Sequence, residues 1–381
     1  MAGFFPVFFK QYWAAGLKPT QSTFLLGLGN SLASLLIVLI ILGLGRLADR
    51  KARRKLFLFA TTLISCVATA AFAFLPQGNA LAAVTVYVIA ALNFGLSMAF
   101  YDALLVEVAS LDELDWLSGV GYALGYLGGG TLFLLNVVMT LKPELFGWDS
   151  PITAVKVSFF SVSVWWILFS LPLFFFTREK AHPAPAENLK LSALFHHLRS
   201  RKKMFYFLLA FLFYNDAVNT IIKMAVDYGA ALGFDSQDLI KALLLVQFIG
   251  FPAALLISLL GRKWGPLKGI YLCIGVYLLT ALLAQRMTSS KDFYFLAALI
   301  GLVQGGIQAL SRSYFARFVP EKEGATYFGI FNLSGRFSAV LGPVLMGALA
   351  LWTESSRASL WVVILFFFIG LLFLKKSQSY S

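Results

Sequence analysis

Long apolar stretches with brief interruptions restrict the fold of this chain more than any other feature. Eleven stretches have about the 20 residues that an α-helix needs to cross the hydrocarbon core of a bilayer. A chain in lipid must satisfy its backbone hydrogen bonds internally, so the pattern predicts an all-α polytopic membrane protein. The expected spans are 22–45, 55–75, 79–108, 115–141, 152–177, 203–226, 237–260, 267–286, 292–316, 324–351 and 358–374.

The excess of basic residues is also explained by a membrane-spanning chain. Only 13% of residues are charged and the net charge is +13, a value that in a soluble protein would suggest nucleic acid. Here 21 of the 31 Lys and Arg fall in loops on one side of the expected spans, so topology explains them and we expect no nucleic-acid partner. By the positive-inside rule these loops and the C-terminus are cytoplasmic, in a cell membrane. They are 46–55, 178–203, 261–268, 312–322 and the tail after Leu374.

The chain is expected to consist of two similar halves. The long, basic, proline-containing connection 178–203 separates an N-terminal half, 1–177, from a C-terminal half, 204–381. A shift of 213 residues places Lys10 on Lys223 and Tyr101 on Tyr314. Parallel six-helix halves are a transporter architecture in which the site lies near the interface of the halves.

The same shift of 213 residues indicates which part of a helix the first residues, MAGFFPVFFKQYW, form. This segment is too short to cross a membrane, lacks the features of a signal peptide, and aligns with the second part of the seventh helix, Tyr214–Val226. We therefore expect a first helix that is truncated at the N-terminus. Either the start codon is misassigned or the helix lacks its cytoplasmic half, and we favour a missing N-terminal segment.

Polar residues within the spans are the candidate site. Such residues normally face the interior of a helix bundle or a watery cavity. Residues four apart share a helix face, and they form polar stripes in the seventh, tenth and eleventh helices. The candidates for substrate binding are Asn215, Asp216, Asn219, Lys223, Gln304, Gln308, Asn332, Tyr101 and, by repeat symmetry, Lys10. The alternative is that they form helix-to-helix hydrogen bonds that hold the bundle together.

Buried carboxylates and cytoplasmic arginines suggest two further roles. Asp102 or Asp216 could carry a coupling proton, because burial disfavours the charged form of a carboxylate. Arg312 and Arg336 lie near the cytoplasmic ends of their helices and are candidate gate residues. The glycines of GVGYALGYLGGG, namely Gly121, Gly125 and Gly129, are expected to allow close helix packing.

The loop between the second and third helices carries the most specific motif, GRLADRKARRK at 45–55. Gly45 would let two helices approach, and Asp49 would cap the next helix or pair with a neighbouring arginine. Together with Arg50, Arg53 and Arg54 they are candidate gating residues. The alternative is a basic loop that only sets topology.

This motif resembles the signature loop of the major facilitator superfamily, G-x-L-x-D-R-x-G-R-R/K, with Ala52 in place of the second glycine. Five other blocks resemble the branch that contains the fungal vacuolar amino-acid effluxer and its bacterial relatives. The resemblance implies a twelve-helix transporter with cytoplasmic termini. The blocks are FYDALLVEVA (100–109), GYALGYLGGG (121–130), FLFYNDAVNT (211–220), GLVQGGIQALSRSYFARFVP (301–320) and FGIFNLSGRFSAVLGP (328–343).

Other function classes lack support in the sequence. There is no Walker-type phosphate loop, the three histidines lie in the central loop without a ligand cluster, and Cys66 and Cys273 lie in apolar spans as packing residues. We therefore expect neither an enzyme nor a cofactor or metal.

The leading hypothesis is a monomeric secondary transporter that exports a small polar solute, such as an amino acid, by alternating access with H+ or Na+ as coupling ion. The alternatives are a lipid translocase on the same fold and a membrane sensor or assembly protein that does not transport.

Overall fold

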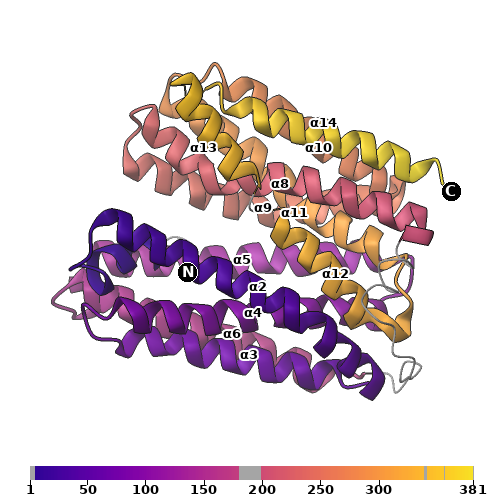
Figure 1. Ribbon diagram of the computed structural model, residues 1–381, viewed down its shortest axis with the longest axis horizontal. Coiled ribbons are helices and arrows are strands. Elements are labelled where there is room, and N and C mark those ends of the chain that lie inside the picture. The colour runs from indigo at the N-terminus through magenta and orange to yellow at the C-terminus, as the bar shows by residue number, and fades with distance from the viewer. Residues whose placement is uncertain (1–4, 180–198, 339–340, 356, 381) are drawn as a thin grey trace. The chain divides into compact units, whose positions relative to one another are not determined.

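A computed structural model describes residues 5–179, 199–338, 341–355 and 357–380 (Figure 1). The long helices are α2 (Pro19–Lys51), α3 (Arg54–Ala71), α4 (Ala80–Val108), α5 (Leu114–Leu141), α6 (Pro151–Phe176), α8 (Lys202–Ala231), α9 (Ser236–Trp264), α10 (Pro266–Ala284), α11 (Ser290–Ala316), α12 (Gly324–Phe337), α13 (Leu341–Thr353) and α14 (Leu360–Gln378). Short helical turns are α1 (Phe5–Phe8), the π-helix η1 (Phe9–Trp13), and the 3₁₀ turns η2 (Phe72–Phe74), η3 (Pro143–Phe146) and η4 (Glu321–Glu323).

Within the described residues, eleven helical segments are long and apolar enough to span a membrane. This confirms the eleven spans and the all-α polytopic architecture expected from the sequence. The expected span 324–351 corresponds to the segment Glu321–Thr353, of which α12 and α13 are described parts.

Local sequence explains where several helices begin and end. Ser150 caps α6 by accepting from the Thr153 N–H, and Pro151 occupies the first helical position, where a missing N–H costs nothing. The residue after α2, Ala52, adopts the left-handed conformation with a φ of 46°. It stands where the superfamily signature has glycine, the residue that adopts this conformation most readily.

The chain packs as two compact units. Unit 1 comprises Met1–Val108, Thr131–Pro185 and Glu321–Asn332, and unit 2 comprises Ala109–Gly130, Ala186–Pro320 and Leu333–Ser381. The first part of α5 thus packs with unit 2, and the first part of α12 packs with unit 1. The connection expected at 178–203 lies mostly outside the described residues, and the division into sequence halves stays a prediction.

In unit 1, α4 packs against α2 and α3, and α3 also packs against α6. The segment expected to be part of a first helix is helical, as α1 and η1, and Phe5, Phe8, Phe9 and Trp13 are buried. Their rings contact Phe72 and Phe159 in one aromatic cluster. Burial of aromatic surface therefore holds this segment in unit 1.

In unit 2, α8 packs along α14, and α11 packs along α9 and α10. The expected close packing is wrong for Gly125 and Gly129, since a Cβ at either would meet no described atom within 4 Å. The close approach of α5 occurs instead at Gly119 and Gly130, where a Cβ would lie 2.0 Å from Ser258 Oγ and 3.2 Å from Gln247 Cβ of α9. These two glycines are three helical turns apart and so share the face that meets α9.

Candidate functional site

The polar stripe of α8 forms a partly buried hydrogen-bond cluster in unit 2. The Asn215 amide nitrogen donates to Ser338 Oγ (2.6 Å), and its oxygen accepts from Gln308 Nε2 of α11 (2.8 Å). Asn219 Nδ2 also donates to Ser338 Oγ, at 3.3 Å. The structure therefore brings together three sequence-predicted residues: Asn215 and Asn219 share Ser338, which the sequence pattern did not single out, and Gln308 binds Asn215 directly.

Asp216, one position along α8, contacts the beginning of α13. Its Oδ1 accepts from the Gly342 N–H (2.9 Å) and from Thr220 Oγ1 (3.3 Å). Asp216 and Thr220 are buried, and a Cβ at Gly342 would lie 1.8 Å from Thr220 Oγ1. The carboxylate thus meets a backbone N–H group that has no partner within its own helix.

One segment of α8 thus holds two consecutive pieces of the chain. Asn215 and Asn219 bind Ser338, just after the end of α12, while Asp216 accepts from the N–H of Gly342, at the start of α13. The polar residues of α8 therefore contact both described parts of this span.

The other candidates of unit 2 lie in different surroundings. Gln304 is half-buried and hydrogen-bonds the Tyr126 side chain. Lys223 is exposed, one turn beyond Asn219 on α8, and Arg336 is half-buried.

Arg312 is buried and engaged with α5. Its Nε donates to Ser118 Oγ and its NH2 group to the Ser118 carbonyl oxygen, both at 2.9 Å. The guanidinium lies 4.7 Å from the centroid of the Tyr122 ring. Cation–π contact and two charge-assisted bonds make Arg312 a strong link between α11 and α5 within unit 2.

Unit 1 brings together two further candidates. Asn332 Nδ2 of α12 donates to Asp102 Oδ2 of α4 (2.9 Å) and to the Phe328 carbonyl oxygen (3.0 Å). Asp102 is buried and Tyr101 is half-buried. Lys10, the repeat counterpart of Lys223, is exposed, as Lys223 is.

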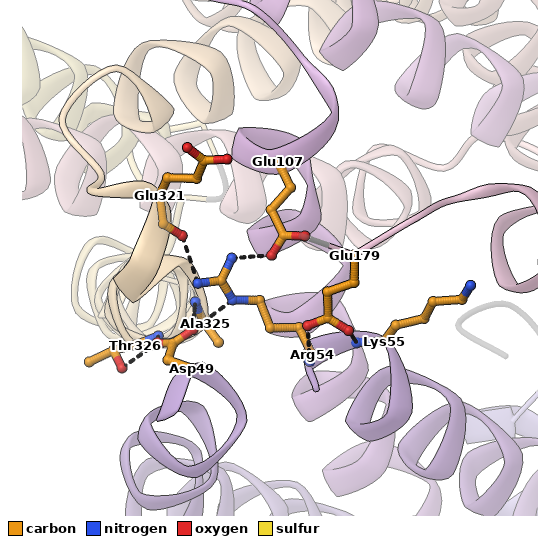
Figure 2. A network of polar contacts seen from close by, with 8 residues as sticks. All are labelled: Asp49, Arg54, Lys55, Glu107, Glu179, Glu321, Ala325 and Thr326. Atoms are coloured by element: carbon orange, nitrogen blue, oxygen red, sulfur yellow. Dashed lines mark hydrogen bonds and ion pairs between the residues drawn. The ribbon is translucent and has the colours of Figure 1, made fainter. Parts of the chain in front are cut away.

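Asp49 is the centre of a buried network in unit 1 (Figure 2). Its Oδ1 accepts from Arg54 Nε (2.7 Å) and from the Ala325 N–H (3.0 Å), and its Oδ2 accepts from the Thr326 N–H (2.8 Å) and hydroxyl (2.7 Å). Arg54 also pairs with Glu107 and donates to the Glu321 carbonyl oxygen at 2.7 Å. The motif thus holds the N-terminus of α12 against the ends of α2, α3 and α4.

This geometry corrects one part of the sequence interpretation. Asp49 pairs with the neighbouring Arg54, as one alternative held, but it caps α12 instead of the next helix, α3. The N-cap position of α3, Arg53, makes no side-chain capping bond. Glu179 accepts from the first two N–H groups of α3, those of Arg54 and Lys55.

Gly45 has the predicted role of allowing close approach. A Cβ there would lie 3.0 Å from the Ala325 carbonyl oxygen, so α2 and α12 meet through the bare backbone. Arg50 and Arg53 of the same motif are exposed.

The acidic segment EVASLDELD holds residues that the sequence analysis missed. Glu107 binds Arg54 in unit 1, while Asp115 binds Ser313 and, at 2.8 Å, Arg317 NH2 in unit 2. The Ser110 hydroxyl and N–H donate to the exposed Glu113 carboxylate and lower its pKa. The signal that could have found them is the acidic run itself, at 107–115, because carboxylates in a chain this basic are suited to pairing with arginine.

Two smaller observations concern ligands. Among the described residues, no three His, Cys, Asp or Glu side chains are grouped so that they could hold a metal ion. Cys66 and Cys273 are buried, and neither is part of a disulfide.

Comparison with other proteins identifies what kind of protein carries these sites. A family model described as "Vacuole effluxer Atg22 like" matches residues 12–110 and 105–378. YxiO of Bacillus subtilis (strain 168), an uncharacterized MFS-type transporter, is 31% identical over 378 residues, which cover 97% of this chain and 88% of that protein. Autophagy-related protein 22 of Yarrowia lipolytica is 23% identical over 287 residues, 65% of this chain and 48% of the fungal protein. This chain spans about half the length of such fungal relatives.

Solved structures show the same fold. The fucose:proton symporter FucP of E. coli superposes with a TM-score of 0.73 at 13% identity, covering 99% of this chain and 94% of that chain. The proton:xylose symporter XylE gives a TM-score of 0.73 at 15% identity, covering 98% and 90%. The two-half fold expected from the sequence is thereby confirmed. The chain belongs to the Atg22-like effluxer family of the major facilitator superfamily and is a multi-pass membrane transporter.

Proposed function

We propose that this transporter exports a small polar solute of the amino-acid class by alternating access. The observation that carries the proposal is the hydrogen-bond cluster in which Asn215 and Asn219 share Ser338 and Gln308 donates to Asn215. Amide side chains both donate and accept, which suits the ammonium and carboxylate groups of a zwitterion. The family description, vacuole effluxer, supports efflux over uptake.

The remaining residues are assigned roles by their chemistry. In unit 2, Asp216 and Lys223 would meet opposite charges of the solute, and Gln304 would orient it. In unit 1, Tyr101, Asn332 and the exposed Lys10 would contact solute. Arg312, Arg336 and the motif residues Gly45, Asp49, Arg50, Arg53 and Arg54 would act in gating, because they hold or flank the ends of helices that must move.

Coupling to protons is the favoured energy source, with Na+ as the alternative. FucP and XylE, which share the fold, are named as proton symporters, and Asp102 and Asp216 are the buried carboxylates of the candidate clusters. Because a relative is bacterial, the proposed location is the plasma membrane. The basic loops and the C-terminus would lie on the cytoplasmic side, and the protein would be a monomer.

Thermal stabilisation by candidate solutes tests the proposal. A ligand at a hundred times its dissociation constant should add about 2.7 kcal/mol to the stability of the purified protein. An amino acid that raises the melting temperature of the wild type and of Lys241→Ala, but not of Lys223→Ala or Asp216→Asn, would support the site. Lys241 is the matched control because it is an exposed lysine of α9, whose ammonium group lies 3.6 Å from Asp238.

Transport in proteoliposomes tests mechanism and coupling. We expect solute efflux that depends on the pH gradient, and an altered pH dependence in Asp102→Asn or Asp216→Asn. An unchanged profile in one variant would remove that residue as the proton carrier. Scrambling of labelled lipid without solute movement would instead identify a lipid translocase, and no activity in either assay would favour a sensor or assembly role.

A further inference from the structure

The start of α8 and the end of α14 form one surface in unit 2. Ser377 Oγ donates to the Lys203 carbonyl oxygen at 2.8 Å, which joins the two helix ends, and Figure 1 shows the C-terminus beside the beginning of α8. The Tyr206 ring of α8 stacks on the Tyr380 ring, with centroids 5.3 Å apart and planes at 4°. We call Lys202, Tyr206, Lys376 and Tyr380 the basic tyrosine surface.

Two ammonium groups lie on these stacked rings. Lys376 Nζ is 4.6 Å from the Tyr206 centroid, and Lys202 Nζ is 5.2 Å from the Tyr380 centroid. The first turn of α8 contains no acidic residue, so the positive end of its dipole adds to the lysine charges. The positive charge here is concentrated and held in place by cation–π contacts.

No carboxylate neutralises these two lysines in the described part of the chain, where the ion pairs involve other bases. A role in topology alone would require only that lysines lie in the loop. It would not require that two of them be placed on a stacked pair of tyrosines. The arrangement places two ammonium donors close together, where both can donate to one anion.

The surroundings identify the source of the anion. The surface lies at the ends of two membrane-length segments, Lys202–Val226 and Leu360–Gln378, where lipid phosphates meet the hydrocarbon region. An exposed apolar stripe runs along α14 at helical spacing and leads to Lys376. It consists of Trp361 (55% exposed), Leu365 (55%), Phe368 (54%) and Leu372 (69%).

We propose that the basic tyrosine surface binds the headgroup of an anionic phospholipid. The phosphate oxygens accept from the Lys202 and Lys376 ammonium groups, and an acyl chain lies along the apolar stripe of α14. Clustered basic residues at the ends of membrane helices bind anionic headgroups in this way. Free phosphate would gain nothing from the stripe, so the lipid is the ligand.

Native mass spectrometry of the purified full chain tests the site, with phosphatidylglycerol and phosphatidylcholine of equal chain length as probes. We expect phosphatidylglycerol to bind at least tenfold more tightly than phosphatidylcholine. Lys202→Gln/Lys376→Gln should lose this preference, and Tyr206→Leu should weaken it. The matched control Arg262→Gln/Lys263→Gln, which removes two exposed bases at the end of α9, should retain it.

Melting curves without lipid verify that each variant is folded. The proposal is overturned if the double-lysine variant binds phosphatidylglycerol as the wild type does, or if the control loses the preference equally. Binding of inorganic phosphate as tight as that of phosphatidylglycerol would also overturn it, because the apolar stripe would then contribute nothing.

Discussion

The replacement Asp49→Asn tests whether the buried network of unit 1 depends on a carboxylate. Asp49 is 2% exposed, and each of its two oxygens accepts two hydrogen bonds. An asparagine has the same shape but only one such oxygen. Its NH2 group must therefore face donors. These are either the N–H groups of Arg54 and Ala325 or the N–H and hydroxyl of Thr326.

The magnitude follows from these contacts. A buried donor left without its acceptor costs about 1–3 kcal/mol, and removing one partner of a buried ion pair costs about 3–5 kcal/mol. Arg54 keeps Glu107 and the Glu321 carbonyl oxygen, and the Thr326 hydroxyl can rotate, so the lower part of this range applies. We expect a loss of about 3 kcal/mol.

The assay is denaturant and thermal unfolding in detergent, with Asp112→Asn as the matched control. Asp112 is an exposed aspartate in the loop before α5, and the same chemical change there should leave the unfolding midpoint unchanged. If Asp49→Asn has the same unfolding midpoint as the wild type, the network contributes no stability and the reasoning from its geometry fails. Equal loss in both variants would show that the effect is one of net charge alone.

Three further experiments have definite expected outcomes. Ala52→Gly should stabilise the protein by about 0.5–1 kcal/mol, because Ala52 has a φ of 46° and glycine adopts this conformation without the Cβ penalty; a lower melting temperature would contradict this. Gly342→Ala should destabilise by about 1–3 kcal/mol through the clash at 1.8 Å from a threonine hydroxyl, whereas wild-type stability would show that α13 shifts freely. In a double-mutant cycle, Asn215→Ala and Gln308→Ala should show a coupling of about 1 kcal/mol from their 2.8 Å bond, and additive losses would mean that the bond does not form.

Hydrogen bonds between residues far apart in the sequence were only partly predictable. Spacing by four placed Asn215 and Asn219 on one face, and the structure confirms that they share a partner. Their partner, Ser338, carried no signal of its own, because a serine in an apolar span commonly bonds back to its own helix. The same holds for Glu107, whose role depends on Arg54, 53 residues earlier in the chain.

The sequence by itself determined the class of the protein. The bilayer thickness sets how long an apolar stretch must be to span it, and that length can be read locally from the sequence. Eleven spans could therefore be counted without any tertiary contact.

Only the tertiary structure decided what each polar group holds. Asp49 caps α12 from a distance of 276 residues, and Asp216 reaches the start of α13, 126 residues away. Buried charges must find partners wherever the chain brings them, because an unpaired charge in an apolar interior costs more than any local preference supplies. Packing therefore chooses the partner, and no pattern within a single helix can specify it.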